Sequence, residues 1–196
     1  MGKVFIFDMG EVLILNVKNL QAIAKRFGLE YKSFREFYGL YDKALMEGKM
    51  EDVAFLRILE KRYNIEIKEN LFISDFHPLP NPFIMEIIQK LRENGHKCVL
   101  GSNTFPPHME VVRKMKEKPL CLLDHLYLSY EMGIAKPSSS FFLQILKEER
   151  VSPQDCVFID DRLANIESAS DLGIKTLLYD NNNKNEAEEF FKEYLQ

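Results

Sequence analysis

The sequence predicts an α/β protein: a doubly wound parallel sheet interrupted by an inserted all-helical segment. Short apolar, β-prone runs alternate with amphipathic stretches after residue 78, and strands that alternate with helices form parallel sheets. The first strand, 4–7, is wholly apolar and is followed by Asp8, as expected of a central strand buried on both faces. Between 17 and 77 apolar residues recur at helical spacing without strand alternation.

These patterns divide the chain into two parts. We expect an α/β core made of residues 1–16 and 78–196, with the helical segment occupying 17–77. A second short apolar run, 12–15, precedes the helical segment, and a cluster of prolines marks the return to the core.

Four more core strands are expected, each followed or preceded by an amphipathic helix. They lie at 97–101, 126–130, 156–159 and 174–179. The tail, 186–195, is rich in glutamate and is expected to form a surface helix.

Composition limits the partners of the protein. Its 196 residues carry a net charge of −4, and 46% of them are hydrophobic. Such a balance argues against nucleic-acid binding, which needs a basic face. No apolar run reaches the roughly 20 residues of a membrane span, so no membrane partner is expected. The sequence gives no indication of the oligomeric state.

The cysteines indicate a reducing compartment. Cys98, Cys121 and Cys156 are widely spaced and form no CxxC pair, which is typical of buried free thiols. No signal peptide precedes the first strand, so we expect a cytoplasmic location.

Polar clusters follow four of the predicted strands. In chain order they are Asp8, the pair Ser102 and Asn103, Lys136 after a short loop, and the pair Asp160 and Asp161. The carboxyl ends of parallel strands meet at one edge of the sheet, where open α/β sheets collect their ligands. We therefore expect these clusters to converge on one crevice.

The clusters have the chemistry of a phosphate site that contains a cation. Asp8 and an aspartate of the 160–161 pair could hold Mg²⁺, which prefers a few carboxylates, water and substrate oxygens. Ser102 and Asn103 could donate hydrogen bonds to phosphate oxygens, and Lys136 could neutralise charge. Asp8 would attack phosphorus to form an aspartyl-phosphate that water hydrolyses. Each residue also has an ordinary structural interpretation, as a helix cap, a turn residue or a solvated lysine.

The order of these motifs resembles the haloacid dehalogenase superfamily, and the similarity covers about 3–15 and 79–180. The helical segment lies where that family places a helical cap. The motifs that carry the resemblance are FIFDMGEVL (5–13), GSN (101–103), GIAKP (133–137) and VFIDDRLANIE (157–167).

The resemblance implies a role for each site residue. Asp8 matches the nucleophile, which is also a metal ligand, and Gly10 matches the position whose backbone carbonyl binds Mg²⁺. Asp161 matches the metal-binding acid. Three further residues, Ser102, Asn103 and Lys136, match the phosphate contacts. Asp160 and Asn165 match residues that contact the metal ligands rather than the metal itself.

One position departs from the family pattern. Most phosphatases of this family carry an aspartate as general acid/base where this chain has Gly10, although a bacterial branch with sugar-1-phosphate phosphatases shares the Asp-x-Gly pattern. The leading hypothesis is a Mg²⁺-dependent phosphatase of a small soluble phosphomonoester, with a sugar phosphate favoured. The alternatives are a catalytically reduced protein that binds a phosphorylated ligand, and a haloacid dehalogenase-type hydrolase in which Asp8 attacks carbon.

Overall fold

Five parallel strands form the central sheet of the computed structural model, which describes residues 2–195. Their order is β5–β4–β1–β6–β7, so the first strand of the chain lies in the middle. The strands are β1 (Val4–Phe7), β4 (Lys97–Ser102), β5 (His125–Leu128), β6 (Cys156–Asp160) and β7 (Lys175–Leu178). The five predicted core strands are all present, with bounds shifted by one or two residues.

The apolar run at 12–15 forms a shorter strand than expected. Only β2 (Ile14–Leu15) is extended, and it pairs antiparallel with β3 (Leu79–Pro80) in a separate two-stranded sheet. These two short strands are the points where the chain leaves the central sheet and returns to it. The pairing therefore holds both ends of the helical segment together beside the core.

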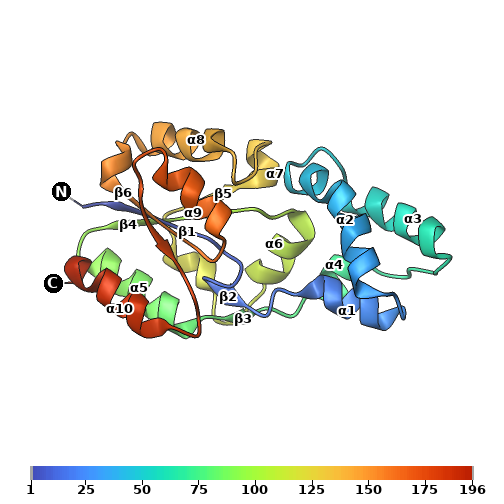
Figure 1. Ribbon diagram of the computed structural model, residues 1–196. Helices are drawn as coiled ribbons and strands as arrows, with labels where there is room; N and C mark the ends of the chain where they lie inside the picture. Colours follow the sequence, from blue (N-terminus) through green and yellow to red (C-terminus); the bar gives the residue numbers. More distant parts are fainter. Residues whose placement is uncertain (1, 196) are drawn as a thin grey trace.

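The sheet is covered on both faces because alternate residues of each strand point to opposite sides. Phe5 and Phe7 pack in a cluster with α5 (Pro82–Glu93), α6 (Pro106–Arg113) and α10 (Lys184–Phe191). Val4 and Ile6 pack in a second cluster with α8 (Ser139–Glu149) and α9 (Leu163–Ser170). Figure 1 shows the sheet between α8 and α9 on one side and α5 and α10 on the other. The doubly wound parallel sheet is confirmed.

The tail is not the purely surface helix that its glutamates suggested. Phe191 in α10 is fully buried, and its ring lies 6.2 Å from that of Phe5 and 6.3 Å from that of Phe7. Tyr194, in the short helix that follows, makes an edge contact with Phe5 at 5.0 Å. Ala187, Phe191 and Tyr194 form an apolar stripe at helical spacing, which the surrounding charges obscured.

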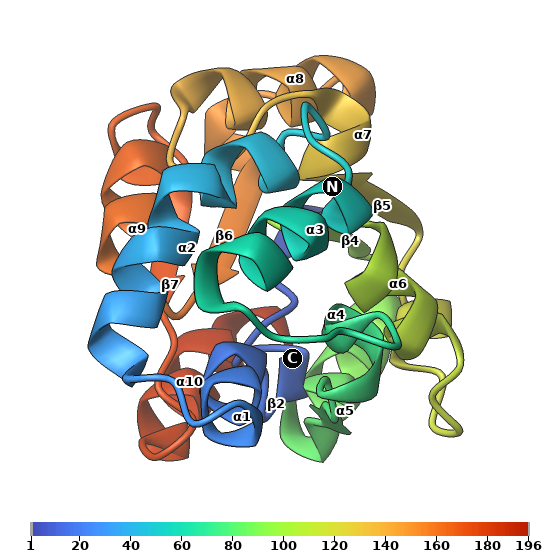
Figure 2. The same ribbon diagram turned by 90° about the vertical axis from the view of Figure 1, so that its right-hand side faces the viewer.

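The inserted segment is helical, as expected. It contains α1 (Asn19–Arg26), α2 (Tyr31–Met46), α3 (Asp52–Tyr63) and α4 (Leu71–Ser74), and no strand among the described residues between β2 and β3. Figures 1 and 2 show these helices at the carboxyl end of the sheet. They pack around their own apolar cluster, into which the core contributes Phe105, 4.9 Å from the ring of Phe72. The division at 16/17 and 77/78 stays a prediction.

The environments of the cysteines are only partly as expected. Cys98 and Cys156 are buried in central strands, whereas Cys121 is exposed. Cys121 lies in a short 3₁₀ segment, Pro119–Leu122, which lies outside the sheet. Within residues 2–195 no helix is both long and apolar enough to span a membrane.

Candidate active site

A cavity of about 600 Å³ lies at the carboxyl edge of the central sheet. One wall comes from the residues that follow β1, β4 and β6, and the opposite wall comes from one face of α2. The strand register explains why the first wall forms. Phe7 of β1 lies beside Leu100 of β4 and Ile159 of β6, so the polar residues after these strands reach the same edge.

Asp8 lies at the base of this cavity. Its backbone N–H donates to the carbonyl of Ile159 at 2.9 Å, which fixes the residue at the end of β1. The residue is only 8% exposed. Its Oδ1 accepts a hydrogen bond from Lys136 Nζ at 2.7 Å. Asp8 is thus a largely buried carboxylate with one oxygen held by a cation.

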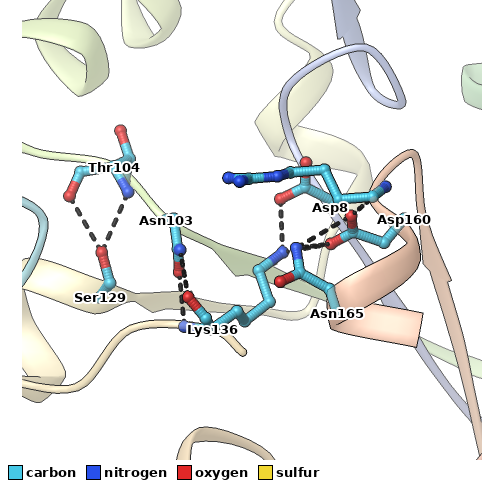
Figure 3. A network of polar contacts seen from close by, with 8 residues as sticks. Asp8, Asn103, Thr104, Ser129, Lys136, Asp160 and Asn165 are labelled. Atoms are coloured by element: carbon cyan, nitrogen blue, oxygen red, sulfur yellow. Dashed lines mark hydrogen bonds and ion pairs between the residues drawn. The ribbon is translucent and has the colours of Figure 1, made fainter. Parts of the chain in front are cut away.

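Lys136 joins two of the predicted carboxylates. Its Nζ also donates to Asp160 Oδ2 at 2.6 Å, and its side chain is 1% exposed. Asn103 holds the backbone of the same residue: its Nδ2 donates to the Lys136 carbonyl, and its Oδ1 accepts from the Lys136 N–H, both at 2.8 Å. Figure 3 shows Asn103 and Lys136 side by side, with Nζ directed toward Asp8 and Asp160. Asn103 therefore positions Lys136 as well as lining the cavity.

The two adjacent aspartates have different environments. Asp160 is fully buried, and its carboxylate accepts from Arg162 N–H at 2.8 Å, from Lys136, and from Asn165 Nδ2 at 3.0 and 2.9 Å. Asp161 is exposed and lines the cavity. The carboxylate of Asp160 is hydrogen-bonded to groups of the protein itself, whereas the carboxylate of Asp161 is open to a ligand.

Negative charge dominates the electrostatics of this cluster. Burial raises the pKa of Asp8 to about 7, with Asp160 and Asp161 adding to the rise and Lys136 opposing it. Burial and the Asp160 charge raise the pKa of Asp161 to about 6. Burial alone would lower the pKa of Lys136, but Asp8 and Asp160 more than offset it and raise that pKa. A further cation at this site would relieve the repulsion.

The carboxylates fit a small divalent cation. One oxygen each from Asp8, Asp160 and Asp161 lie within 4.8 Å of one another. Since Asp160 is hydrogen-bonded from three directions, Asp8 and Asp161 are the residues that would hold Mg²⁺, together with water and substrate oxygens. Gly10 also lines the cavity, where its backbone carbonyl was predicted to contribute.

Gly10 leaves space beside the carboxylate of Asp8. A Cβ at this position would lie 3.5 Å from Val17 Cγ2 and 3.9 Å from Asp8 Oδ2, which are ordinary contact distances. The backbone of Gly10 is not in the left-handed region of positive φ, so a residue other than glycine can adopt it. The backbone and the nearest atoms therefore accept a Cβ at position 10, and a side chain there would begin next to Asp8.

The structure brings together most of the residues predicted from the sequence. Six of them line the cavity: Asp8, Gly10, Asn103, Lys136, Asp161 and Asn165. Asp160 lies directly behind them through its bond to Lys136. Ser102 is 1% exposed at the end of β4 and is not among the lining residues, so its contact with phosphate stays a prediction.

Sequence reasoning missed the residues that α2 contributes, and it also missed a histidine. His108 lines the cavity and pairs with Asn19 Nδ2 through Nε2 at 2.9 Å. Its ring stacks on Phe76 with centroids 4.2 Å apart. Burial lowers the pKa of His108 to about 3, so the ring is neutral at pH 7. Nothing in the local sequence distinguished His108 from a surface histidine at the start of a helix.

Comparison with known proteins gives relatives that match from about half to 91% of this chain. The chain is 30% identical over 185 residues, or 91% of its length, to drimenol cyclase drtB of Aspergillus calidoustus, and covers 34% of that protein. It is 34% identical over 102 residues to the D-ribitol-5-phosphate phosphatase of Bacteroides thetaiotaomicron, with half of this chain and 49% of that protein covered. The chain thus spans about a third to a half of the curated relatives it matches.

Solved structures share the fold over nearly the whole chain. A predicted HAD-like family hydrolase of Porphyromonas gingivalis superposes with a TM-score of 0.79 at 24% identity, covering 98% of both chains. A HAD family enzyme of Bacteroides thetaiotaomicron, in its magnesium complex, superposes with a TM-score of 0.77 at 23% identity, covering 91% of this chain and 93% of that one.

The family model covers four of the five central strands and the inserted helices. The model of the haloacid dehalogenase-like hydrolases matches residues 3–173. This span includes the central strands β1, β4, β5 and β6 and the cavity residues described above. The chain therefore belongs to the haloacid dehalogenase-like hydrolases.

Proposed function

We propose that this protein is a Mg²⁺-dependent phosphatase that hydrolyses a small phosphomonoester through an aspartyl-phosphate on Asp8. The observation that carries the proposal is the position of Asp8. It is a buried carboxylate in the wall of a cavity, with Lys136 on one oxygen and Asp161 nearby. This combination supplies a nucleophile, a fixed cation and an open carboxylate for a metal.

The chemistry proceeds in two displacements. In the first, an oxygen of Asp8 attacks phosphorus in line, the ester P–O bond breaks, and the leaving oxygen takes a proton. In the second, water attacks phosphorus and gives up a proton, the P–O bond to Asp8 breaks, and inorganic phosphate and the Asp8 carboxylate are released. Bound Mg²⁺ supplies charge neutralisation for the phosphoryl oxygens. Lys136 donates to one oxygen of Asp8 and opposes the rise in the pKa of that carboxyl, which favours the ionised form that attacks phosphorus.

Gly10 has no side chain that could give a proton to the leaving group. With no side chain at this position, the residue that follows the nucleophile by two cannot donate it, so water or another group must do so. General acid–base catalysis is typically worth about 10²–10⁴ in rate. We therefore expect slow turnover on alkyl phosphates, sugar and polyol phosphates included, and faster chemistry on aryl phosphates, whose leaving groups need little protonation.

The relatives' names point to two kinds of leaving group. D-Ribitol 5-phosphate and flavin mononucleotide, named for relatives of Bacteroides thetaiotaomicron and Arabidopsis thaliana, are both phosphate esters of a ribityl chain. The Aspergillus relatives are named for drimenol and sesquiterpenes. We favour a sugar or polyol phosphate for this chain.

The test is phosphate release from a panel of sugar, polyol, nucleotide and aryl phosphates, with Mg²⁺ and with EDTA. We expect release that requires Mg²⁺ and that disappears in Asp8→Asn. Asp171→Asn, an exposed aspartate at the end of α9, is the matched control and should retain activity. Activity that persists in Asp8→Asn would disprove the aspartyl-phosphate route.

Gly10→Asp separates a slow enzyme from a binding protein. A Cβ at position 10 would make only ordinary contacts beside Asp8, so we expect an aspartate there to raise phosphate release by about 10-fold or more if the other parts of the site are competent. If the wild type releases no phosphate but is stabilised against heat by phosphate esters, and Gly10→Asp is also inactive, the alternative of a phospholigand-binding protein is supported.

A further inference from the structure

One face of α2 forms the wall of the cavity opposite the catalytic aspartate. Arg35, Tyr38, Gly39, Asp42 and Met46 all line it, and their spacing of three, one, three and four residues places them on one side of a helix. Figure 2 shows α2 lying beside α9, in front of the carboxyl edge of the sheet. This face therefore meets whatever is attached to a phosphate bound at Asp8.

Charged groups lie on both sides of this space. Asp42 is half-buried and lies against the Tyr38 hydroxyl. Burial raises the pKa of both Asp42 and Asp161, and the charge of Arg162, on the core side, opposes the rise at each. Its backbone is fixed by the bond from its N–H to Asp160, while its side chain is exposed in the cavity. Arg162 thus lines the same cavity as Asp161 and as Asp42 of α2.

Gly39 keeps this wall open. A glycine inside a helix costs about 0.5–1 kcal/mol relative to alanine, and Gly39 lies well within α2. A Cβ at Gly39 would meet no atom within 4 Å, so packing within the protein does not require glycine there. The missing side chain instead enlarges the cavity between Arg35 and Asp42.

We propose that Asp42 and Arg35 of α2, facing Arg162 of the core, form a subsite that binds the hydroxyl groups of a polyol or sugar leaving group. This assignment rests on the proposed phosphatase function and names the residues that select its substrate. Asp42 accepts hydrogen bonds from substrate hydroxyls, and the two arginines donate to their oxygens. Asp42 and Arg35 are specificity-determining residues that take no part in the displacement at phosphorus.

The charges on the walls favour a hydroxylated leaving group over an isoprenoid one. An apolar chain would displace water from Asp42 and Arg162 without replacing its hydrogen bonds, and unpaired charged groups are costly to bury. A polyol chain offers both donors and acceptors at every carbon. Sites built around such hydrogen bonds discriminate strongly against analogues that lack the hydroxyls. The lining also has apolar residues that can cover the carbon backbone of a sugar: Met9, Val17, Leu20, Met46 and Phe76.

The experiment compares kcat/KM, measured in the presence of Mg²⁺, for three substrates: D-ribitol 5-phosphate, p-nitrophenyl phosphate and geranyl phosphate. In Asp42→Ala we expect kcat/KM for D-ribitol 5-phosphate to fall about 10- to 100-fold, the range for losing a hydrogen bond to a charged group. Activity on p-nitrophenyl phosphate should stay within about 2-fold because its leaving group has no hydroxyls to lose. Arg35→Ala should show the same selective loss. Glu36→Ala, exposed on α2 outside the cavity, is the matched control and should change neither value.

The outcomes separate this inference from the proposed function. If the wild type hydrolyses p-nitrophenyl phosphate but prefers geranyl phosphate to D-ribitol 5-phosphate, the polyol subsite is wrong and the phosphatase stands. An equal loss on all substrates in Asp42→Ala, or no loss on any, also overturns the subsite. If no substrate releases phosphate, the proposed function fails and the subsite fails with it.

Discussion

Replacing Lys136 with methionine tests whether the buried ammonium holds the candidate site together. The substitution keeps an unbranched apolar stem but removes the bonds from Nζ to Asp8 and Asp160, at 2.7 and 2.6 Å. The side chains involved are 1%, 12% and 0% exposed, respectively, for Lys136, Asp8 and Asp160. Two carboxylates are then left facing each other with little access to water.

The expected cost follows from this burial. Removing one partner of a buried ion pair typically destabilises a protein by about 3–5 kcal/mol because the other charge stays buried without compensation. Asp8 borders the cavity and can be partly solvated there, so we expect a loss near the lower end, about 3 kcal/mol. A surface ion pair, by comparison, contributes only about 0–1 kcal/mol.

The assay is urea unfolding at about pH 8 in EDTA, so that no divalent cation replaces the ammonium. Lys90→Met is the matched control, because Lys90 pairs with Glu86 at 2.6 Å with side chains 50% and 64% exposed. We expect this control to lose less than about 0.5 kcal/mol. Equal losses in the two variants would refute the view that Lys136 compensates the buried aspartates.

Two further predictions concern the histidine of the cavity and the contact between the helical segment and the core. Burial lowers the pKa of His108 to about 3, below the roughly 6.5 of an unfolded chain, so its contribution to stability is present above pH 6.5 and is lost as the pH falls toward 3. Between about pH 7.5 and 5.5 the wild type should therefore lose about 1 kcal/mol more free energy of unfolding than His108→Gln, and parallel pH profiles would contradict this reasoning. Gly48→Ala should destabilise the protein by more than the roughly 1–3 kcal/mol expected for left-handed backbone alone, because φ is +65° and the new Cβ would lie 2.5 Å from the Tyr130 carbonyl oxygen. Gly28→Ala, with φ +63° and no atom within 4 Å, carries only the backbone cost, so similar unfolding midpoints for the two variants would show that the contact with Tyr130 is unimportant.

Local pattern was sufficient for the elements whose burial is set by neighbours in sequence. The run that forms β1 is apolar on both faces, and the structure places it in the middle of the sheet with all four residues buried. The polar residues after the strands could be expected at one edge because parallel strands share their direction. That is why Asp8, Lys136 and Asp161 were named from the sequence and lie in one cavity.

Pattern alone failed where apolar residues are few or serve two roles. In α10 the buried Phe191 lies among glutamates, so composition suggested a surface helix. Tyr38 has the spacing of a core residue of α2 and is buried, yet it also lines the cavity. Helical periodicity shows which side of a helix is apolar but not which other element that side meets.

The sequence by itself determined the α/β architecture, the helical insertion and the identity of the residues at the strand ends, because periodicity and short motifs are encoded within a few residues of each other. Only the tertiary structure decided which of these residues are hydrogen-bonded within the protein and which are open to a ligand. Asp160 is satisfied by Lys136 and Asn165, which leaves the adjacent Asp161 open to a ligand. It also decided that Asp42 of α2 faces the cavity. Both results depend on contacts between segments far apart in the chain, and the docking of one segment on another leaves no local signal in either.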